Sequence, residues 1–428
     1  MSLDSKLDPL FEKLVNDKWI PGIAGAIYDA NGEALYRKAF GVNNLGDADS
    51  KPFTTSTPLS LFSTTKLITS VAALQLLEQG KISLHDHAEK YVPELADIPV
   101  LSGYDANGTA QYRPQRKKIT ILNLLTHTAG FTYDFFDQST LEWRVGVQQK
   151  EPLRYQTGAK WAFQTPRIFE AGEDFTYGIN TDWLGFVIEA VSGQKLPEYV
   201  NVNILEPLGL QNTFANPVEY LTKTNGSIDD LLPLYLRSPE DGSLSTLPAP
   251  PADAPPPEVY GGGHFLSGTI DDYSQFLLAI INYGTHPKSK VQILKRETVK
   301  KYLFRDFIPQ VAPHTKKVGR ITSSLAQASQ TGQFLPGIPV GWSTGFLVNN
   351  ADVPDRRRRG SGFWAGLGNL YYWVDPTAGR LGIVVTSVLP FLDTRVLSVF
   401  DDMEKVAYGG EPETDPSKRA WVVPLPEE

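Results

Sequence analysis

Strand patterns occupy the two ends of this chain, and helical patterns occupy its long middle. Residues 21–41 predict two strands joined at Asn31-Gly32, a dipeptide that tolerates the positive φ of a tight hairpin turn. Later strands are predicted at 344–349, 369–374 and 381–388, before a final helix at 394–408. This order predicts an α/β (α+β) fold, in which a central antiparallel sheet from both chain ends is flanked by helices and carries a helical insertion.

The helix predicted from Ser63 to Gln79 is apolar nearly all round, and Gly80 is its expected stop. Such a helix is buried between layers. We therefore expect residues 1–85 and 200–428 to form an α/β subdomain and 86–199 a mainly helical one, with an active site at their interface. Residues 231–259, rich in proline, glycine and serine, predict an extended surface excursion.

Composition excludes several classes of protein. With 40 basic and 48 acidic residues the net charge is -8, which argues against nucleic acid or an anionic membrane as a partner. The only concentrated basic run, 356–359, is interpreted as a solvated hairpin tip. There is no cysteine, which excludes disulfides and thiol catalysis. Without an apolar leader or membrane span we expect a cytoplasmic protein, whose oligomeric state stays open and for which a monomer is plausible.

Ser63-Thr64-Thr65-Lys66 places a hydroxyl and an amine three residues apart at the start of the apolar helix. Positions i and i+3 share a helix face, so the Lys66 amine can reach the Ser63 oxygen. A serine hydroxyl is a weak nucleophile, and a desolvated, neutral amine can take its proton. The pattern indicates acyl transfer through a serine ester, although an N-capping serine beside a solvent-facing lysine would produce it too.

Two other serines carry similar patterns. Ser192 precedes Lys195 by three residues, but Gly193 breaks the helical geometry that would bring them together. Ser343 lies in Gly-Trp-Ser-Thr-Gly, the pattern of a nucleophile elbow, yet the last histidine is His314, so no base follows it. We assign Ser343 a structural role.

Three further features bear on the site. Tyr177 lies in a turn before a helix, where most tyrosines are packing residues. Beside a cationic lysine its pKa would be lowered, and it could then act as general base and acid. Glycines in the segment 361–369 would let the backbone approach a ligand closely, or form a bulge. His127 is interpreted as structural, and no histidine cluster or phosphate loop indicates a metal or any other cofactor.

Taken together, Ser63-Thr64-Thr65-Lys66, Tyr177 and Trp364-Ala365-Gly366 resemble the three motifs of the penicillin-binding-protein-like and class C β-lactamase-like serine hydrolases. The resemblance spans nearly the whole chain and implies a β-lactamase-like fold. At the third motif Trp364 stands where the lactamase branch usually has lysine, which is similar to the family VIII carboxylesterases and the lovastatin-type fungal acyltransferases. Asn180 also lies one place later than in the lactamase pattern.

The resemblance implies Ser63, Lys66 and Tyr177 as catalytic residues. It places Trp364, Ala365, Gly366, Leu367 and Asn180 in the oxyanion or substrate site, with the backbone N–H groups of Ser63 and Leu367 forming the oxyanion hole. The expected activity is that of a serine carboxylesterase on small to medium esters, through an acyl-Ser63 intermediate. The alternatives are an acyltransferase that uses an alcohol of a secondary metabolite, a β-lactamase or D-amino-acid peptidase, and a non-enzymatic binding protein. The expected partners are a small-molecule ester and an alcohol acceptor or acyl donor.

Overall fold

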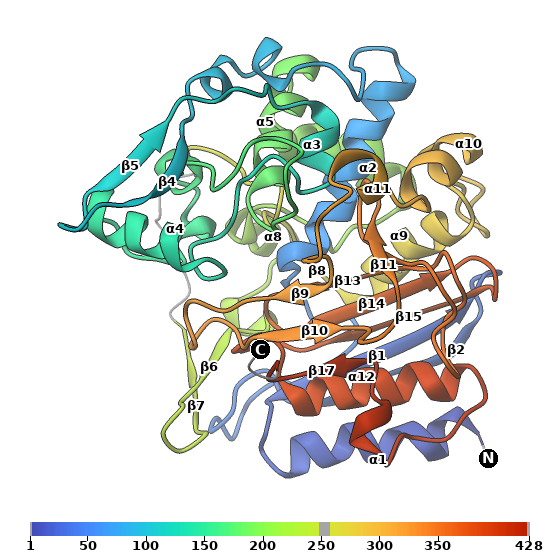
Figure 1. Ribbon diagram of the computed structural model, residues 1–428. Helices are drawn as coiled ribbons and strands as arrows, with labels where there is room; N and C mark the ends of the chain where they lie inside the picture. Colours follow the sequence, from blue (N-terminus) through green and yellow to red (C-terminus); the bar gives the residue numbers. More distant parts are fainter. Residues whose placement is uncertain (1, 248–256, 426–428) are drawn as a thin grey trace.

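The centre of the molecule is a seven-stranded antiparallel sheet, seen at the lower right of Figure 1. The structure is a computed structural model that describes residues 2–247 and 257–425. The strands lie in the order β11 (Val340–Trp342), β12 (Leu347–Asn349), β13 (Gly362–Gly366), β14 (Leu370–Asp375), β15 (Arg380–Val385), β1 (Gly22–Asp29) and β2 (Ala34–Gly41). Because β1 pairs with β15, the prediction of a sheet built from both chain ends is confirmed.

The hairpin at the start of the chain forms as its turn residues predict. β1 and β2 pair antiparallel, and Gly32 in the turn between them has a φ of 85°. That left-handed conformation is accessible to glycine without steric cost. The local turn chemistry therefore sets the register of the first two strands.

Helices cover both faces of the sheet (Figure 1). On one face, α1 (Leu3–Asn16) packs against α12 (Thr394–Ala407), which ends one residue before the predicted helix. On the other face, α9 (Ile270–Ile281) contacts β1, β14 and β15. Helix α2 (Thr65–Glu78) packs against α5 (Asn180–Ser192). The side chains of α2 are buried from Thr65 to Leu76, polar ones included, which confirms a helix held between layers.

Residues 86–199 hold helices and also a hairpin that the sequence did not predict. Helix α3 (Ile121–Leu125) packs against α5. Strands β4 (Val100–Tyr104) and β5 (Ala110–Arg113) pair antiparallel at the outer edge of Figure 1, near α4 (Gln138–Glu142). The turn is held by Asp105, whose Oδ1 accepts hydrogen bonds from the backbone of Asn107 and Thr109. Because β5 is largely exposed, it lacks the alternation of buried side chains by which a strand is recognised.

The segment 231–259 is more ordered than a surface excursion in the part that the structure describes. Strands β6 (Tyr235–Arg237) and β7 (Leu244–Thr246) form a hairpin, and β6 also pairs in parallel with β16 (Val388–Leu389). The expectation of an extended loop is wrong for these strands, because the pairing partner lies far away in the sequence. The proline-rich residues 248–256 lie outside the described residues.

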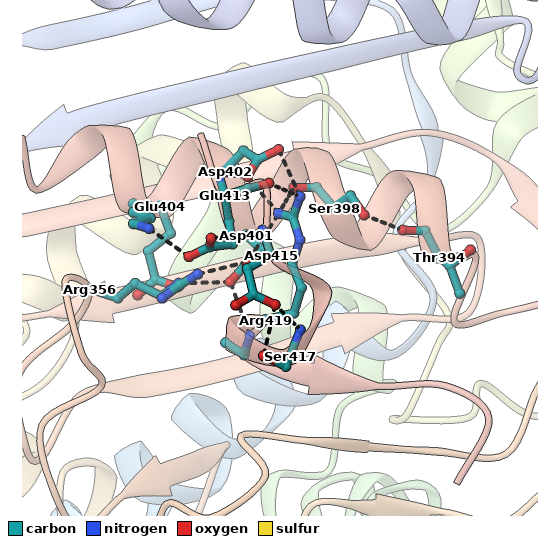
Figure 2. Close-up of polar contacts among 12 residues, drawn as sticks. Arg356, Thr394, Ser398, Asp401, Asp402, Glu404, Glu413, Asp415, Ser417 and Arg419 are labelled. Atoms are coloured by element: carbon teal, nitrogen blue, oxygen red, sulfur yellow. Dashed lines mark hydrogen bonds and ion pairs between the residues drawn. The ribbon is translucent and has the colours of Figure 1, made fainter. Parts of the chain in front are cut away.

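The basic run at 356–359 is not a solvated tip. Arg356 and Arg357 are buried, whereas the two arginines after them are exposed. Arg357 donates through Nε and Nη2 to the two carboxylate oxygens of Glu404, at 2.9 and 2.8 Å. Arg356 donates to Asp401 at 2.8 Å, as Figure 2 shows. The prediction fails because the acids that compensate these charges lie on α12, about 45 residues away along the chain.

The same acids hold the end of the chain against α12. Arg419 donates to Asp401 and Asp402 at 3.1 and 2.5 Å, and to the Glu413 carbonyl at 2.7 Å (Figure 2). Next to it, β17 (Trp421–Val422) pairs with β10 (Gly332–Phe334). The C-terminal segment is thus part of the folded body.

The remaining α-helices and strands of the described residues are short. They are α6 (Leu196–Val200), α7 (Glu206–Leu208), α8 (Pro217–Thr224), α10 (Arg296–Thr298), α11 (Ile308–Val311), β3 (Leu59–Ser60), β8 (Ser267–Gly268) and β9 (Arg320–Ile321). Among the helices of the described residues, none has the length and apolar content that a membrane crossing requires.

Candidate active site

Ser63 lies in a strained turn that leads directly into α2. The turn is a short 3₁₀ helix, Phe62–Thr64, in which Phe62 has a φ of 46°. A non-glycine residue in this region costs about 1–3 kcal/mol, so the surroundings must hold it. They do so from both sides: the Leu61 N–H donates to the Leu266 carbonyl at 2.9 Å, and the Thr64 hydroxyl donates to the Leu61 carbonyl at 2.7 Å. Ser63 itself is half-buried.

Lys66 lies one turn further along, with its amine directed at Ser63. Its Nζ is 3.1 Å from the Ser63 Oγ, 2.9 Å from the Tyr133 hydroxyl and 3.1 Å from the Gly263 carbonyl oxygen. The side chain is buried. Burial lowers the pKa of the Lys66 amine to about 8, although the nearby Asp182 carboxylate raises it. Lys66 is therefore not the solvent-facing lysine of the alternative interpretation, and its amine lies where it could accept the Ser63 proton.

Tyr177 and Trp364 meet on the other side of Ser63. The Trp364 Nε1 donates to the Tyr177 hydroxyl at 2.9 Å, and the two rings are 4.7 Å apart. The Tyr177 hydroxyl is also hydrogen-bonded to Ser63. Burial raises the pKa of the Tyr177 phenol above its ordinary value, and its hydrogen bonds to Ser63 and Trp364 offset only part of that rise. The expectation of a lowered pKa is wrong, because loss of solvation outweighs any effect of the lysine.

The end of β13 lies against the turn that holds Ser63. A Cβ at Gly366 would come within 2.9 Å of the Leu61 carbonyl oxygen, so the glycine permits this close approach. Ala365 precedes it, buried and paired with Tyr371 of β14. Leu367 follows directly and is half-buried. The third motif therefore lies next to the backbone of Ser63.

Asn180 is held away from the hydroxyl and amine groups. It is fully buried at the start of α5, and its Nδ2 donates to the Phe131 carbonyl at 2.8 Å and to the His127 Nδ1 at 3.1 Å. The His127 ring lies 4.7 Å from that of Tyr177. Burial lowers the pKa of His127 well below its ordinary value, so the ring is neutral. Both side chains support the turn that carries Tyr177.

The other two serines have structural surroundings. Ser343 is fully buried, and its Oγ donates to the Phe346 carbonyl at 3.1 Å and accepts from the N–H groups of Gly345 and Phe346. Ser192 ends α5, where Gly193 has a φ of 72°. Within the described part of the chain, no group of three or more His, Cys, Asp or Glu side chains could hold a metal ion.

Sequence reasoning did not single out three residues that lie around the Lys66 amine. They are Tyr133, Asp182 and His264, which come from three separate segments. The triple glycine before His264 was the available signal, since consecutive glycines mark a backbone that approaches something closely.

Comparison with known proteins gives the family. A family model described as Beta-lactamase matches residues 7–397. The chain belongs to this family. The resemblance and the fold expected from the sequence are therefore confirmed, with the β-lactamase fold joining an antiparallel sheet to helices.

Curated relatives include a transferase and an esterase. The chain is 28% identical over 412 residues to the ML-236A carboxylate methylbutanoyltransferase of Penicillium citrinum, and the match covers 94% of each chain. It is 28% identical over 393 residues to the lovastatin esterase of Penicillium rubens, covering 90% of this chain and 93% of that one. The solved structure of the unliganded selenomethionyl simvastatin synthase of Aspergillus terreus matches with a TM-score of 0.79 at 25% identity, covering 94% of this chain and 97% of that one.

Proposed function

We propose that this protein is a serine esterase that forms an acyl-Ser63 intermediate on small to medium carboxylic esters and can pass the acyl group to an alcohol. The observation that carries the proposal is the 3.1 Å approach of the buried Lys66 amine to the Ser63 hydroxyl. Burial holds the Lys66 pKa near 8, which leaves part of the amine neutral at physiological pH. The site lies where the two subdomains meet, since Ser63, Tyr177 and Trp364 come from 1–85, 86–199 and 200–428 respectively.

In the acylation step, the Ser63 Oγ attacks the ester carbonyl carbon and its proton passes to the Lys66 amine. The carbonyl electron pair moves to the oxygen, and the backbone N–H groups of Ser63 and Leu367 stabilise the resulting oxyanion. Loss of one such donor typically costs about 3–4 kcal/mol of transition-state stabilisation. When the tetrahedral intermediate collapses, the departing alkoxide takes a proton from the Tyr177 hydroxyl, which Trp364 orients. Lys66 then returns its proton to Tyr177.

Deacylation follows the same path in reverse. Water or an alcohol attacks the acyl-serine carbonyl carbon while its proton passes to the Lys66–Tyr177 pair, and the proton returns to the Ser63 oxygen as the ester bond breaks. Because the Lys66 amine lies 3.1 Å from the Ser63 Oγ and 4.8 Å from the centre of the Tyr177 ring, we assign the proton transfer to the two residues together and not to a single base. Ala365 and Gly366 hold the end of β13 against the turn of Ser63, which brings Leu367 beside it, and Asn180 acts through the turn that carries Tyr177.

Two observations favour acyl transfer as a second activity. Relatives of nearly full length include a transferase as well as an esterase, at the same 28% identity. The walls around Ser63 are aromatic: Tyr133 and Tyr177 lie 5.9 Å apart, and Phe136 lies 6.2 Å from Tyr177. An apolar wall favours an organic alcohol over water near the acyl-serine. A β-lactamase is a weaker proposal, since Trp364 donates to Tyr177 and leaves no cation at the third motif.

Intact mass spectrometry after incubation with a serine-directed phosphonate tests the nucleophile. We expect one adduct on the wild type and none on Ser63→Ala. Ser343→Ala is the matched control, because this buried serine has every hydrogen bond satisfied by its own turn. An adduct on Ser63→Ala at the wild-type rate would remove Ser63 from the proposal. Adding alcohol acceptors to an aryl ester reaction, and following new ester against free acid, separates transfer from hydrolysis.

A further inference from the structure

A chain of polar side chains continues behind the Lys66 amine, beyond the groups that the proposed reaction uses. The Tyr133 hydroxyl, which contacts Lys66 at 2.9 Å, lies 3.5 Å from the Asp182 Oδ2. The Asp182 Oδ1 lies 3.3 Å from the His264 Nδ1 and accepts from the Gly263 N–H at 2.9 Å. Asp182 is fully buried and His264 is nearly so, with 9% of its side chain exposed. A carboxylate at this depth needs compensation.

Hydrogen-bond directions identify what compensates it. A backbone carbonyl can only accept, so the contact of the His264 Nε2 with the Tyr155 carbonyl at 2.9 Å requires an N–H on that nitrogen. The other ring nitrogen, Nδ1, faces the Asp182 carboxylate, which also accepts. An imidazole that donates from both nitrogens is protonated and carries a positive charge. With a proton on both nitrogens, His264 would form a buried ion pair with Asp182.

The contacts of the Lys66 amine are compatible with the neutral form that accepts a proton in the proposed reaction. The Gly263 carbonyl takes one N–H of the Lys66 amine, and the Tyr133 oxygen takes another. The third contact is Ser63, whose hydroxyl can donate. Two donated bonds and one accepted bond satisfy a neutral amine completely. Its lone pair then points at the proton that it must take.

The triple glycine is the wall that brings these groups together. A Cβ at Gly263 would lie 2.8 Å from the Lys66 Nζ and 2.9 Å from either Asp182 oxygen. A Cβ at Gly261 would lie 2.6 Å from both the Asp182 Oδ1 and the His264 ring. No real side chain fits at such distances, so only glycine allows the backbone to run between the amine and the ion pair.

We propose that His264 is a positioning residue that acts through Asp182: as the counterion of this carboxylate, it prevents Asp182 from pairing with Lys66 and so keeps the amine available to Ser63. This inference rests on the proposed function, in which the Lys66 amine is the base, and it concerns the groups that tune the proton affinity of that amine. Without the His264 charge, the Asp182 carboxylate would stabilise the ammonium form of Lys66. Without Asp182, nothing in this chain of contacts would hold a proton on Lys66.

The other titratable groups packed around these residues are neutral or already paired. Burial raises the pKa of each of three neighbouring phenols above its ordinary value, and the imidazole on the far side of Tyr177 is neutral; these groups are Tyr133, Tyr155, Tyr177 and His127. On the Tyr155 side, Asp134 is paired with Arg144 at 2.9 Å. The ring of Phe163 stacks on His264. Burial is the largest cause of the lowered Lys66 pKa, and Asp182 is the charged neighbour that raises it.

The test compares the pH dependence of kcat/KM for the full-length wild type, His264→Gln, Asp182→Asn and the double variant, with a short-chain aryl ester. In the wild type, kcat/KM should rise with pH to a plateau, with a midpoint near 8. We expect the midpoint to move up by about one unit in His264→Gln, which lowers kcat/KM about tenfold at pH 6.5. It should move down in Asp182→Asn and return toward the wild-type value in the double variant. Thermal unfolding of each variant accompanies the profiles.

A purely structural role cannot move the midpoints of the two single variants in opposite directions. Damage to the fold would lower the plateau of kcat/KM and leave its midpoint in place. Midpoints that stay in place, or move the same way in both single variants, would overturn the inference. A wild type with no turnover and no phosphonate adduct would instead overturn the proposed function. If either variant fails to fold, the ¹⁵N shifts of the wild-type His264 ring at pH 7 decide: two protonated nitrogens support the ion pair, and a neutral tautomer contradicts it.

Discussion

The hydrogen bond from Trp364 to Tyr177 offers a sharp test of how the third motif serves the reaction. Trp364→Phe removes the indole N–H, which lies 2.9 Å from the phenol oxygen, and keeps a ring in place. A donor to an ionised partner contributes about 1.5–3 kcal/mol, against about 0.5–1.5 for a neutral one. In the proposed mechanism, Tyr177 gains negative charge when it gives its proton to the leaving alkoxide. The difference between the two contributions, about 1–1.5 kcal/mol, corresponds at 1.36 kcal/mol per tenfold change to a fall in kcat/KM of about 5- to 13-fold.

Trp342→Phe is the matched control for this change. Trp342 is buried against Trp364, with ring centroids 4.4 Å apart, but its Nε1 donates to the Leu125 carbonyl at 3.3 Å. Both substitutions remove the same atoms from one aromatic cluster, and each should cost about 1–2 kcal/mol of stability through the void that it leaves. Only Trp364→Phe removes a donor from Tyr177.

The assay is steady-state hydrolysis of an alkyl ester, whose alcohol needs a proton to leave, with melting temperatures measured in parallel. We expect similar melting temperatures for the two variants and a kcat/KM that falls about 5- to 13-fold further for Trp364→Phe. An equal loss of kcat/KM in both would refute the argument, since packing around Tyr177 would then account for it. Unchanged kcat/KM in Trp364→Phe would refute it more directly.

Two further predictions concern stability. Burial lowers the pKa of the Lys66 amine from 10.5 to about 8, so keeping the ammonium buried costs the folded protein roughly 3 kcal/mol. Replacing Lys66 removes this cost, but it leaves the Gly263 carbonyl without its donor, which destabilises the folded protein by about 1–2 kcal/mol. Lys66→Met should therefore raise the free energy of unfolding by about 1–2 kcal/mol at pH 7 while abolishing turnover. The gain should shrink between pH 8 and 10.5, where the folded wild type has lost the Lys66 proton and the unfolded chain still holds it. A variant that is less stable than the wild type in urea titrations would contradict this. Arg419→Met leaves Asp402 without its partner and should lower the free energy of unfolding by about 3 kcal/mol by the same measurement. Lys418→Met, at an exposed residue, should leave it almost unchanged. Equal losses in the two variants would show that the Arg419 contacts do not anchor the chain end.

Much of the architecture could be predicted because its signals are local. The Asn31-Gly32 turn, the all-round apolar α2 and the helix at 394–407 each follow from neighbouring residues, and the structure agrees with all three. The β4–β5 hairpin and the β6–β16 pairing could not be predicted in this way. One is exposed and the other joins distant strands, so neither leaves a periodic pattern in its own segment.

The same division runs through the charged residues. A run of four arginines reads as solvated because arginine is almost always exposed unless it is paired. Arg356 and Arg357 are buried because Asp401 and Glu404 on α12 meet them in space. Pairing between residues so far apart has no signature in the run itself.

The sequence by itself determined which groups could do the chemistry. Ser63 and Lys66 lie three residues apart at a helix start, and that spacing alone brings a hydroxyl within reach of an amine. The proton affinities of the Lys66 amine and the Tyr177 phenol were decided only by the tertiary structure. Whether an amine or a phenol is the better proton acceptor depends on burial and on nearby charges, and here these come from Trp364, Asp182 and His264, which are far from Ser63 along the chain. Desolvation and Coulomb interactions act through space, which is why the direction of the Tyr177 shift could not be read from its neighbours in sequence.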